Sequence, residues 1–136
     1  MSVQEQQELS GKYYAEAMRY MSNAREYLKS AQKEDDVYRD PKYVRTACGT
    51  AYSGVLIAMD GFFMLKGLHK PTKKERKSIE YYQNNLANQD KKMLTNLTIV
   101  YKILRLAGYY DGINDAIVIK RGFDLADDLI EKIKPM

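Results

Sequence analysis

The stretch AYSGVLIAMDGFFMLKG, from Ala51 to Gly67, is the most apolar segment of the chain. Only Ser53, Asp60 and Lys66 interrupt it. Its length and composition suit one helix that is apolar on nearly every side, and such a helix must be covered on more than one side. We therefore predict that the other helices of the chain pack around this one.

Two apolar stripes run along this helix at helical spacing. The first is an ordinary core stripe and consists of Cys48, Ala51, Val55, Ala58, Met59 and Phe62. The second contains two glycines and consists of Gly54, Ile57, Gly61 and Met64. Glycine within a helix costs about 0.5–1 kcal/mol relative to alanine, so two glycines indicate a close approach by another element. This second stripe is either a tight contact with another helix of the same chain or the interface of a homodimer.

The first half of the chain is predicted to form two long antiparallel helices. Ser2 and Glu5 have the spacing of a capping box, which marks the start of the first helix. Asp40 followed by Pro41 is a typical helix start, and Gly67 is a typical helix end. The predicted bounds are residues 2–34 for the first helix and 41–66 for the second.

The second half of the chain is predicted to form two further helices. Thr72 and Glu75 have the spacing of another capping box, which starts the third helix. Weak periodicity over residues 84–90 predicts a break in this helix, and Gly108 is expected to end it. Asn114 is the expected cap of the last helix.

No alternating pattern typical of strands is present, so the fold class is predicted to be all-α. Short connections favour antiparallel neighbours, and the predicted architecture is an up-down bundle of four main helices, with the third helix broken. A length of 136 residues suits one domain, and we expect residues 1–136 to form it.

Several features of composition indicate a cytoplasmic protein. Its single cysteine, Cys48, fits a reducing compartment. The polar N-terminal residues do not resemble a secretory signal, and the longest apolar run is broken at Asp60 and is expected to be too short to span a bilayer. The net charge of +4 is mild. We therefore expect no membrane partner.

The residue types do not complete a metal or catalytic site. The only histidine, His69, and the only cysteine, Cys48, are placed on different predicted elements, so we expect no transition-metal site and no cysteine–histidine pair. The chain contains no glycine-rich phosphate loop. No catalytic residue and no cofactor are predicted from these patterns.

A basic segment over residues 66–77 is the strongest electrostatic feature of the sequence. Its candidate contacts to RNA or DNA are Lys70, Lys73, Lys74 and Lys77. The alternative interpretation is a solvated loop and helix start.

Two stretches resemble the HEPN superfamily of helical domains. The run 51–67 resembles the second helix of that superfamily, with an apolar run that closes in Leu-x-x-Gly form. The stretch 105–111, RLAGYYD, resembles its later motif, Arg-x-x-Ala-Asp-Tyr. A final amphipathic helix follows at the spacing of the family, so the resemblance spans about residues 10–133.

The resemblance implies a small helical bundle, commonly homodimeric, that cleaves RNA or partners a nucleotidyltransferase. Active members resemble one another in an Arg-x4-6-His motif. Arg105 matches the arginine, but Tyr110, Asp111 and Gly112 stand where the histidine would fall. We therefore expect a non-catalytic binding module, with its ligand or partner site at Arg105, Tyr109, Tyr110 and Asp111. The alternatives are a divergent enzyme that acts on RNA or nucleotides, and a nucleic-acid-binding protein that uses the basic segment 66–77.

Overall fold

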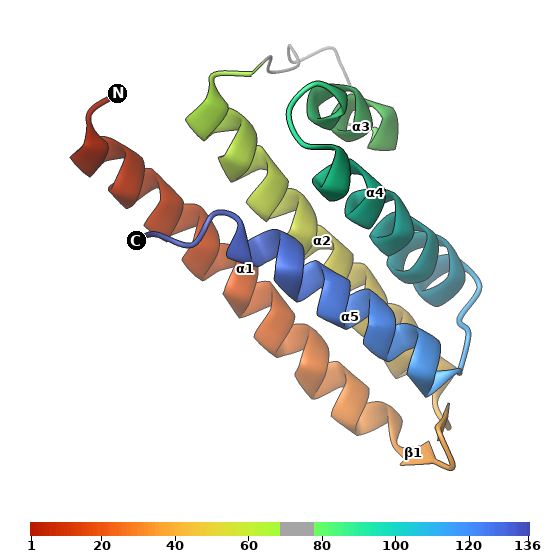
Figure 1. Ribbon diagram of the computed structural model, residues 1–136. Coiled ribbons are helices and arrows are strands. Elements are labelled where there is room, and N and C mark those ends of the chain that lie inside the picture. Colours follow the sequence, from red (N-terminus) through yellow and green to blue (C-terminus); the bar gives the residue numbers. More distant parts are fainter. Residues whose placement is uncertain (69–77) are drawn as a thin grey trace.

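The computed structural model describes residues 1–68 and 78–136, and its fold is all-α apart from one small hairpin. Figure 1 shows the long helices side by side, each running opposite to the one before it, with α3 at the end where α4 begins. The all-α fold class is thereby confirmed. The elements are α1 (Val3–Ala31), β1 (Lys33–Glu34), β2 (Val37–Tyr38), α2 (Pro41–Lys66), α3 (Ile79–Ala87), α4 (Lys91–Val100), the π-helix η1 (Tyr101–Tyr110) and α5 (Ala116–Glu131).

Local capping signals fix the start of α1 and both ends of α2 where the sequence predicts them. The Ser2 hydroxyl accepts a hydrogen bond from the Glu5 backbone N–H at 3.1 Å. The Asp40 carboxylate accepts one from the Lys42 backbone N–H at 3.0 Å. Gly67 closes α2 in the left-handed conformation, with φ of 66°, which glycine adopts without steric cost.

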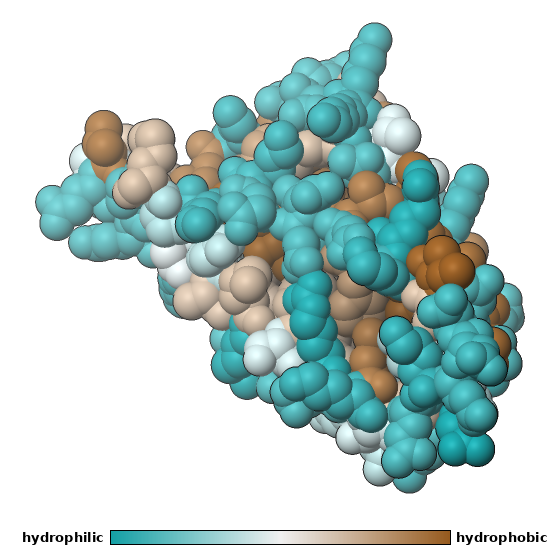
Figure 2. All heavy atoms as spheres, turned by 60° about the horizontal axis from the view of Figure 1, so that its bottom comes forward, coloured by the Kyte–Doolittle hydropathy of each residue, from teal (hydrophilic) through white to brown (hydrophobic). Residues whose placement is uncertain are grey.

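The hairpin between α1 and α2 corrects the prediction of a longer first helix and of no strands. Helix α1 ends at Ala31, and Lys33–Glu34 pairs with Val37–Tyr38 in antiparallel register. Asp35 and Asp36 form the two-residue turn with φ values of 53° and 63°, a conformation that aspartate tolerates. Strands of two residues are too short to produce an alternating pattern. Figure 2 shows this end of the bundle largely covered by hydrophilic side chains.

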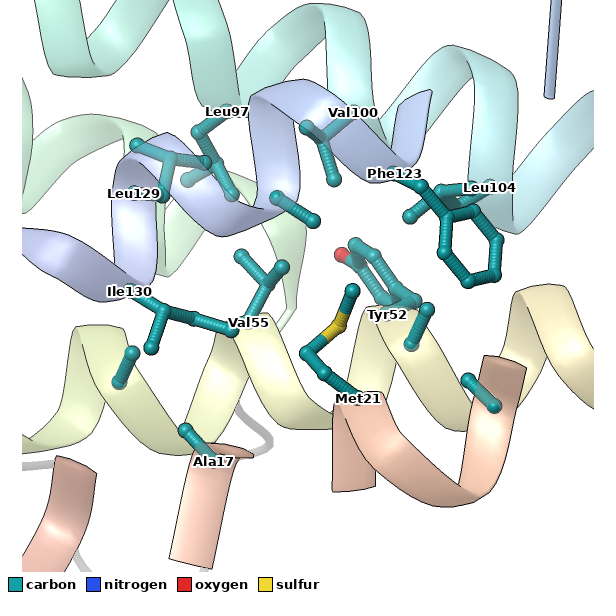
Figure 3. Close-up of a cluster of buried hydrophobic side chains, with 14 of the residues drawn as sticks. Ala17, Met21, Tyr52, Val55, Leu97, Val100, Leu104, Phe123, Leu129 and Ile130 are labelled. Atoms are coloured by element: carbon teal, nitrogen blue, oxygen red, sulfur yellow. The ribbon is translucent and has the colours of Figure 1, made fainter. Parts of the chain in front are cut away.

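Helix α2 is the centre of the core, as its composition predicts. It packs against α1, η1 and α5. Figure 3 shows Tyr52 and Val55 of α2 among side chains from α1, α4, η1 and α5. The side chains of those helices that Figure 3 labels are all buried: Ala17, Met21, Leu97, Val100, Leu104, Phe123, Leu129 and Ile130.

The length of α2 corrects the expectation that the apolar run is too short to span a bilayer. By length and composition alone, the 26 residues of Pro41–Lys66 form a helix that is long enough to cross a membrane. The same test is passed by core helices of soluble proteins, and half of the apolar window is buried inside this bundle. Its one acidic interruption, Asp60, accepts a hydrogen bond from the hydroxyl of buried Tyr82 at 3.0 Å.

The two glycines of the second stripe lie against α1 of the same chain. A Cβ atom at Gly61 would lie 2.7 Å from the Tyr13 Cβ, and one at Gly54 would lie 3.0 Å from the Tyr20 Cβ. The Tyr13 hydroxyl also lies 2.8 Å from the Met64 sulfur. The structure therefore supports the intrachain interpretation, because Gly54, Gly61 and Met64 are already occupied by α1. Homodimerisation along this stripe, with Ile57, stays a prediction.

The third predicted helix is broken where expected but ends later. Helix α3 ends at Ala87 and α4 starts at Lys91, which confirms the break. Gly108 does not end the helix: η1 continues to Tyr110. A Cβ atom at Gly108 would lie only 2.4 Å from the Cys48 sulfur, so this glycine permits η1 and α2 to approach closely.

The last helix is capped one residue later than predicted. The Asp115 carboxylate, rather than the Asn114 side chain, accepts hydrogen bonds from the backbone N–H groups of Ile117 and Val118, at 3.0 and 3.2 Å. The Asn114 backbone carbonyl instead accepts a hydrogen bond from the Tyr38 N–H at 2.8 Å. That bond ties the start of α5 to the hairpin.

Candidate functional site

The π-helix η1 places two tyrosine rings around one guanidinium. Hydrogen bonds in a π-helix join residues five apart, so Arg105 and Tyr110 stand one turn from each other. The Arg105 guanidinium carbon lies 4.7 Å from the centre of the Tyr110 ring and 5.0 Å from that of Tyr109. The Arg105 Nη2 donates to the Tyr110 hydroxyl at 3.0 Å. These contacts hold the cation on the surface of η1.

A second arginine reaches the same tyrosine from α2. The Arg45 Nη1 donates to the Tyr110 backbone carbonyl at 3.0 Å. A Cβ atom at Gly112 would lie 2.5 Å from the Arg45 Nε, and Gly112 has φ of 63°, so both space and backbone favour glycine there. Two cations from different helices therefore converge on Tyr110.

A surface groove of about 370 Å³ lies beside these two arginines. The ring of Tyr109 covers Gly49, where a Cβ atom would lie 3.1 Å from the ring edge. The lining has two guanidinium groups, five hydroxyl groups and no carboxylate. It consists of Tyr20, Arg45, Thr46, Gly49, Thr50, Ser53, Arg105 and Tyr109.

A second hollow of about 420 Å³ adjoins the first. Both hollows are lined by Ser53 and Arg105, so the Arg105 side chain lies between them. The second hollow differs in character because it contains aliphatic side chains and one carboxylate. Its other lining residues are Tyr52, Leu56, Ser78, Ile79, Glu80 and Tyr101.

Two titratable groups behind the groove are held in their neutral forms. Burial raises the pKa of Cys48 to about 12, and the thiol is fully buried. Burial also raises the pKa of Tyr52 to about 12, with a further rise from Tyr101 and an opposing effect of Arg105. Near neutral pH neither of these two side chains therefore adds a negative charge beside the groove arginines.

The family of the chain follows from a comparison with known domains. The family described as Domain of unknown function (DUF5618) matches residues 12–135. The chain belongs to this family. The DUF5618 chain is also similar to a solved protein of unknown function from Dyadobacter fermentans, with 41% sequence identity, 98% of each chain covered and a TM-score of 0.81. No curated protein matches it.

In this DUF5618 protein, the structure brings together three of the four residues predicted at the HEPN-like motif. Arg105 and Tyr109 line the groove, and Tyr110 contacts both arginines. Asp111 instead follows the end of η1, where it is exposed and outside the groove lining. Four predicted nucleic-acid contacts, Lys70, Lys73, Lys74 and Lys77, lie outside the described residues.

The α2 side of the groove was missed by the sequence prediction. It consists of Arg45, Thr46, Gly49, Thr50 and Ser53. The sequence does contain a pattern that indicates this side of the groove: positions 46, 49, 50 and 53 have the i, i+3, i+4, i+7 spacing of one helix face. Small polar residues at that spacing, beside the apolar stripes of α2, mark a face that is not packed into the core.

Proposed function

We propose that the protein is a non-catalytic, HEPN-like four-helix binding module that holds an anionic group, of the phosphate class, in the groove between α2 and η1. Guanidinium groups bind phosphate oxygens through paired, charge-assisted hydrogen bonds, and hydroxyl groups donate further ones. The groove offers both kinds of donor: two arginines, and the hydroxyl groups of Tyr20, Thr50 and Tyr109. The Thr46 and Ser53 hydroxyls already donate to backbone carbonyls of α2.

The observation that carries this proposal is that both groove arginines lack a carboxylate partner. Among the described residues, neither Arg45 nor Arg105 forms an ion pair, and each makes one hydrogen bond to Tyr110. A guanidinium carries five N–H donors, so most of them remain available to a ligand. By contrast, ion pairs with carboxylates are formed by Arg19, Arg25 and Arg39.

The non-catalytic assignment is supported by the state of the available nucleophile. A cysteine attacks as its thiolate, and the Cys48 thiol is buried with its pKa raised to about 12. Among the described residues, the groove lining contains no carboxylate or imidazole that could serve as a general base. Its hydroxyl groups are suited to binding an anion rather than to moving a proton at neutral pH.

The proposal is tested by calorimetric titration of the purified protein with inorganic phosphate at low ionic strength. We expect binding that weakens by about tenfold in Arg45→Gln and in Arg105→Gln, since a hydrogen bond to a charged group contributes about 1.5–3 kcal/mol. Arg121→Gln is the matched control, because Arg121 is an exposed arginine of α5 outside the groove.

Equal phosphate affinity in the two groove variants and the Arg121 control would overturn the proposal. Loss of binding in all three would indicate a general effect of net charge and would also overturn it. Thermal unfolding of each variant shows whether the fold is retained.

We also propose that the module self-associates, but through a surface other than Gly54 and Gly61. The exposed apolar side chains of η1 support this, since Leu106, Tyr109 and Tyr110 are 37%, 41% and 55% exposed. Light scattering over a dilution series should give twice the chain mass of 15.8 kDa, and Leu106→Glu should lower it. A nucleotidyltransferase-type partner and a cytoplasmic location stay predictions.

A further inference from the structure

The groove does not end at Arg105, and its continuation has a different chemistry. Beyond Arg105, the second hollow is lined by Leu56 and Ile79, by the rings of Tyr52 and Tyr101, and by the carboxylate of Glu80. Glu80 lies in the first turn of α3, is exposed and forms no ion pair among the described residues. Among the described residues, the two adjoining hollows therefore present guanidinium groups without a carboxylate partner and, in the second hollow, a carboxylate without an ion-pair partner.

We propose that the ligand of this groove is bipolar: a phosphate-class anion joined through an apolar spacer to an ammonium group. This inference rests on the proposed function, because it takes the anion to lie between Arg45 and Arg105. The ammonium group lies in the second hollow, against Glu80.

The charged side chains that line the two hollows decide where the anion and the ammonium group of the ligand lie. Arg105 lines both hollows, so an ammonium group in the second hollow is repelled from the Arg105 side and attracted toward Glu80. The apolar spacer has partners in the same hollow, because Leu56 and Ile79 are half-buried and line it.

Neutral groups of the second hollow also suit an ammonium group. Ammonium has three N–H donors and needs acceptors, and the hydroxyl oxygens of Ser53 and Ser78 line the hollow. Aromatic faces attract cations, and the Tyr52 and Tyr101 rings lie 6.0 Å apart, centre to centre, in its wall. A second anionic group would meet Glu80 there, and Arg105 is the only cation among the described residues of the lining.

The test compares probes that differ only in the terminal ammonium group. Aminohexyl phosphate is compared with hexyl phosphate, and aminopropyl phosphate with propyl phosphate, by calorimetry on the full chain. We expect at least one amino compound to bind about fivefold tighter than its alkyl counterpart, the range of a partly exposed ion pair. In Glu80→Gln the amino compound should no longer bind tighter than its alkyl counterpart, whereas the affinity for inorganic phosphate should not decrease.

Glu8→Gln, at an exposed glutamate of α1, is the matched control and should keep the preference. If neither amino compound binds tighter than its alkyl counterpart while inorganic phosphate still binds, the bipolar ligand is overturned and the anion site stands. If the preference survives in Glu80→Gln, the assignment of Glu80 is overturned. Absence of phosphate binding overturns both the proposed function and this inference.

Discussion

The Arg105 guanidinium donates a hydrogen bond of 3.0 Å to the Tyr110 hydroxyl, five residues further along the same π-helix. The same Tyr110 accepts a hydrogen bond from Arg45 through its backbone carbonyl. Tyr110 is 55% exposed, so it holds two cations at the surface rather than in the core. It is therefore a positioning residue for the groove.

Removing the Tyr110 hydroxyl tests that role. Tyr110→Phe keeps the ring under the Arg105 guanidinium and deletes the hydrogen bond, so the arginine gains conformational freedom that a ligand must remove. We expect the affinity for inorganic phosphate to fall about two- to fivefold, measured by calorimetry, with an unchanged unfolding temperature. Tyr27→Phe, at an exposed tyrosine of α1, is the control. An unchanged affinity would remove Tyr110 from the site.

Adding a methyl group at Gly61, in the contact between α1 and α2, should destabilise the fold. Because a Cβ atom there would lie 2.7 Å from both Cβ and Cγ of Tyr13, Gly61→Ala forces α1 and α2 apart. We expect the free energy of unfolding to fall by about 1–3 kcal/mol in urea denaturation. Gly11→Ala is the control: no atom lies within 4 Å of its Cβ position, so alanine should stabilise α1 by about 0.5–1 kcal/mol. Equal effects at both glycines would contradict the close contact.

The Cys48 thiol should be protected from alkylation in the folded protein. Burial raises its pKa from 9.0 to about 12, which lowers the thiolate fraction near neutral pH by roughly a thousandfold. The side chain is also fully buried. Reaction with iodoacetamide, followed by mass spectrometry, should be slow in buffer and fast in concentrated urea. Rapid labelling in buffer would show that α2 and η1 separate readily.

Alkaline pH should destabilise the fold through Tyr52. Burial raises its pKa from 10.0 to about 12, so the folded state holds this proton more tightly than the unfolded state. The resulting stability is fully present below about pH 10 and is lost as the pH rises through about 12. Tyr52→Phe should flatten the decline in unfolding free energy over that window by roughly 3 kcal/mol at most. Tyr27→Phe, at an exposed tyrosine of α1, is the control. An identical slope in both variants would contradict the burial effect.

Helix ends could be predicted from the sequence where the residue at the end has only one common structural role. Asp40 followed by Pro41 starts α2, and Gly67 ends it, because capping depends only on neighbouring backbone groups. Gly108 shows why other ends could not be predicted. Glycine ends helices but also permits close contact, and at Gly108 it is the Cys48 side chain of α2, sixty positions earlier in the sequence, that decides between the two.

The candidate site could be predicted in part for the same reason. Arg105, Tyr109 and Tyr110 share one helical turn, so their proximity is a local property of η1. Arg45 joins them only because α2 packs along η1, and this pairing depends on the whole bundle. Gly54 and Gly61 of α2 illustrate the complementary case: the sequence predicted a close partner but could not decide between α1 and a second chain.

The π-helical form of η1 limits how the length of this segment can change during evolution. Each π-type hydrogen bond spans one more residue than an α-helical one. Deleting a single residue between Tyr101 and Tyr110 would favour an ordinary α-helix and would rotate the following residues by about 100° relative to those before the deletion. Gly108 would then turn away from Cys48, and the tyrosines away from Arg105. We therefore expect related sequences to tolerate substitutions in η1 far better than insertions or deletions.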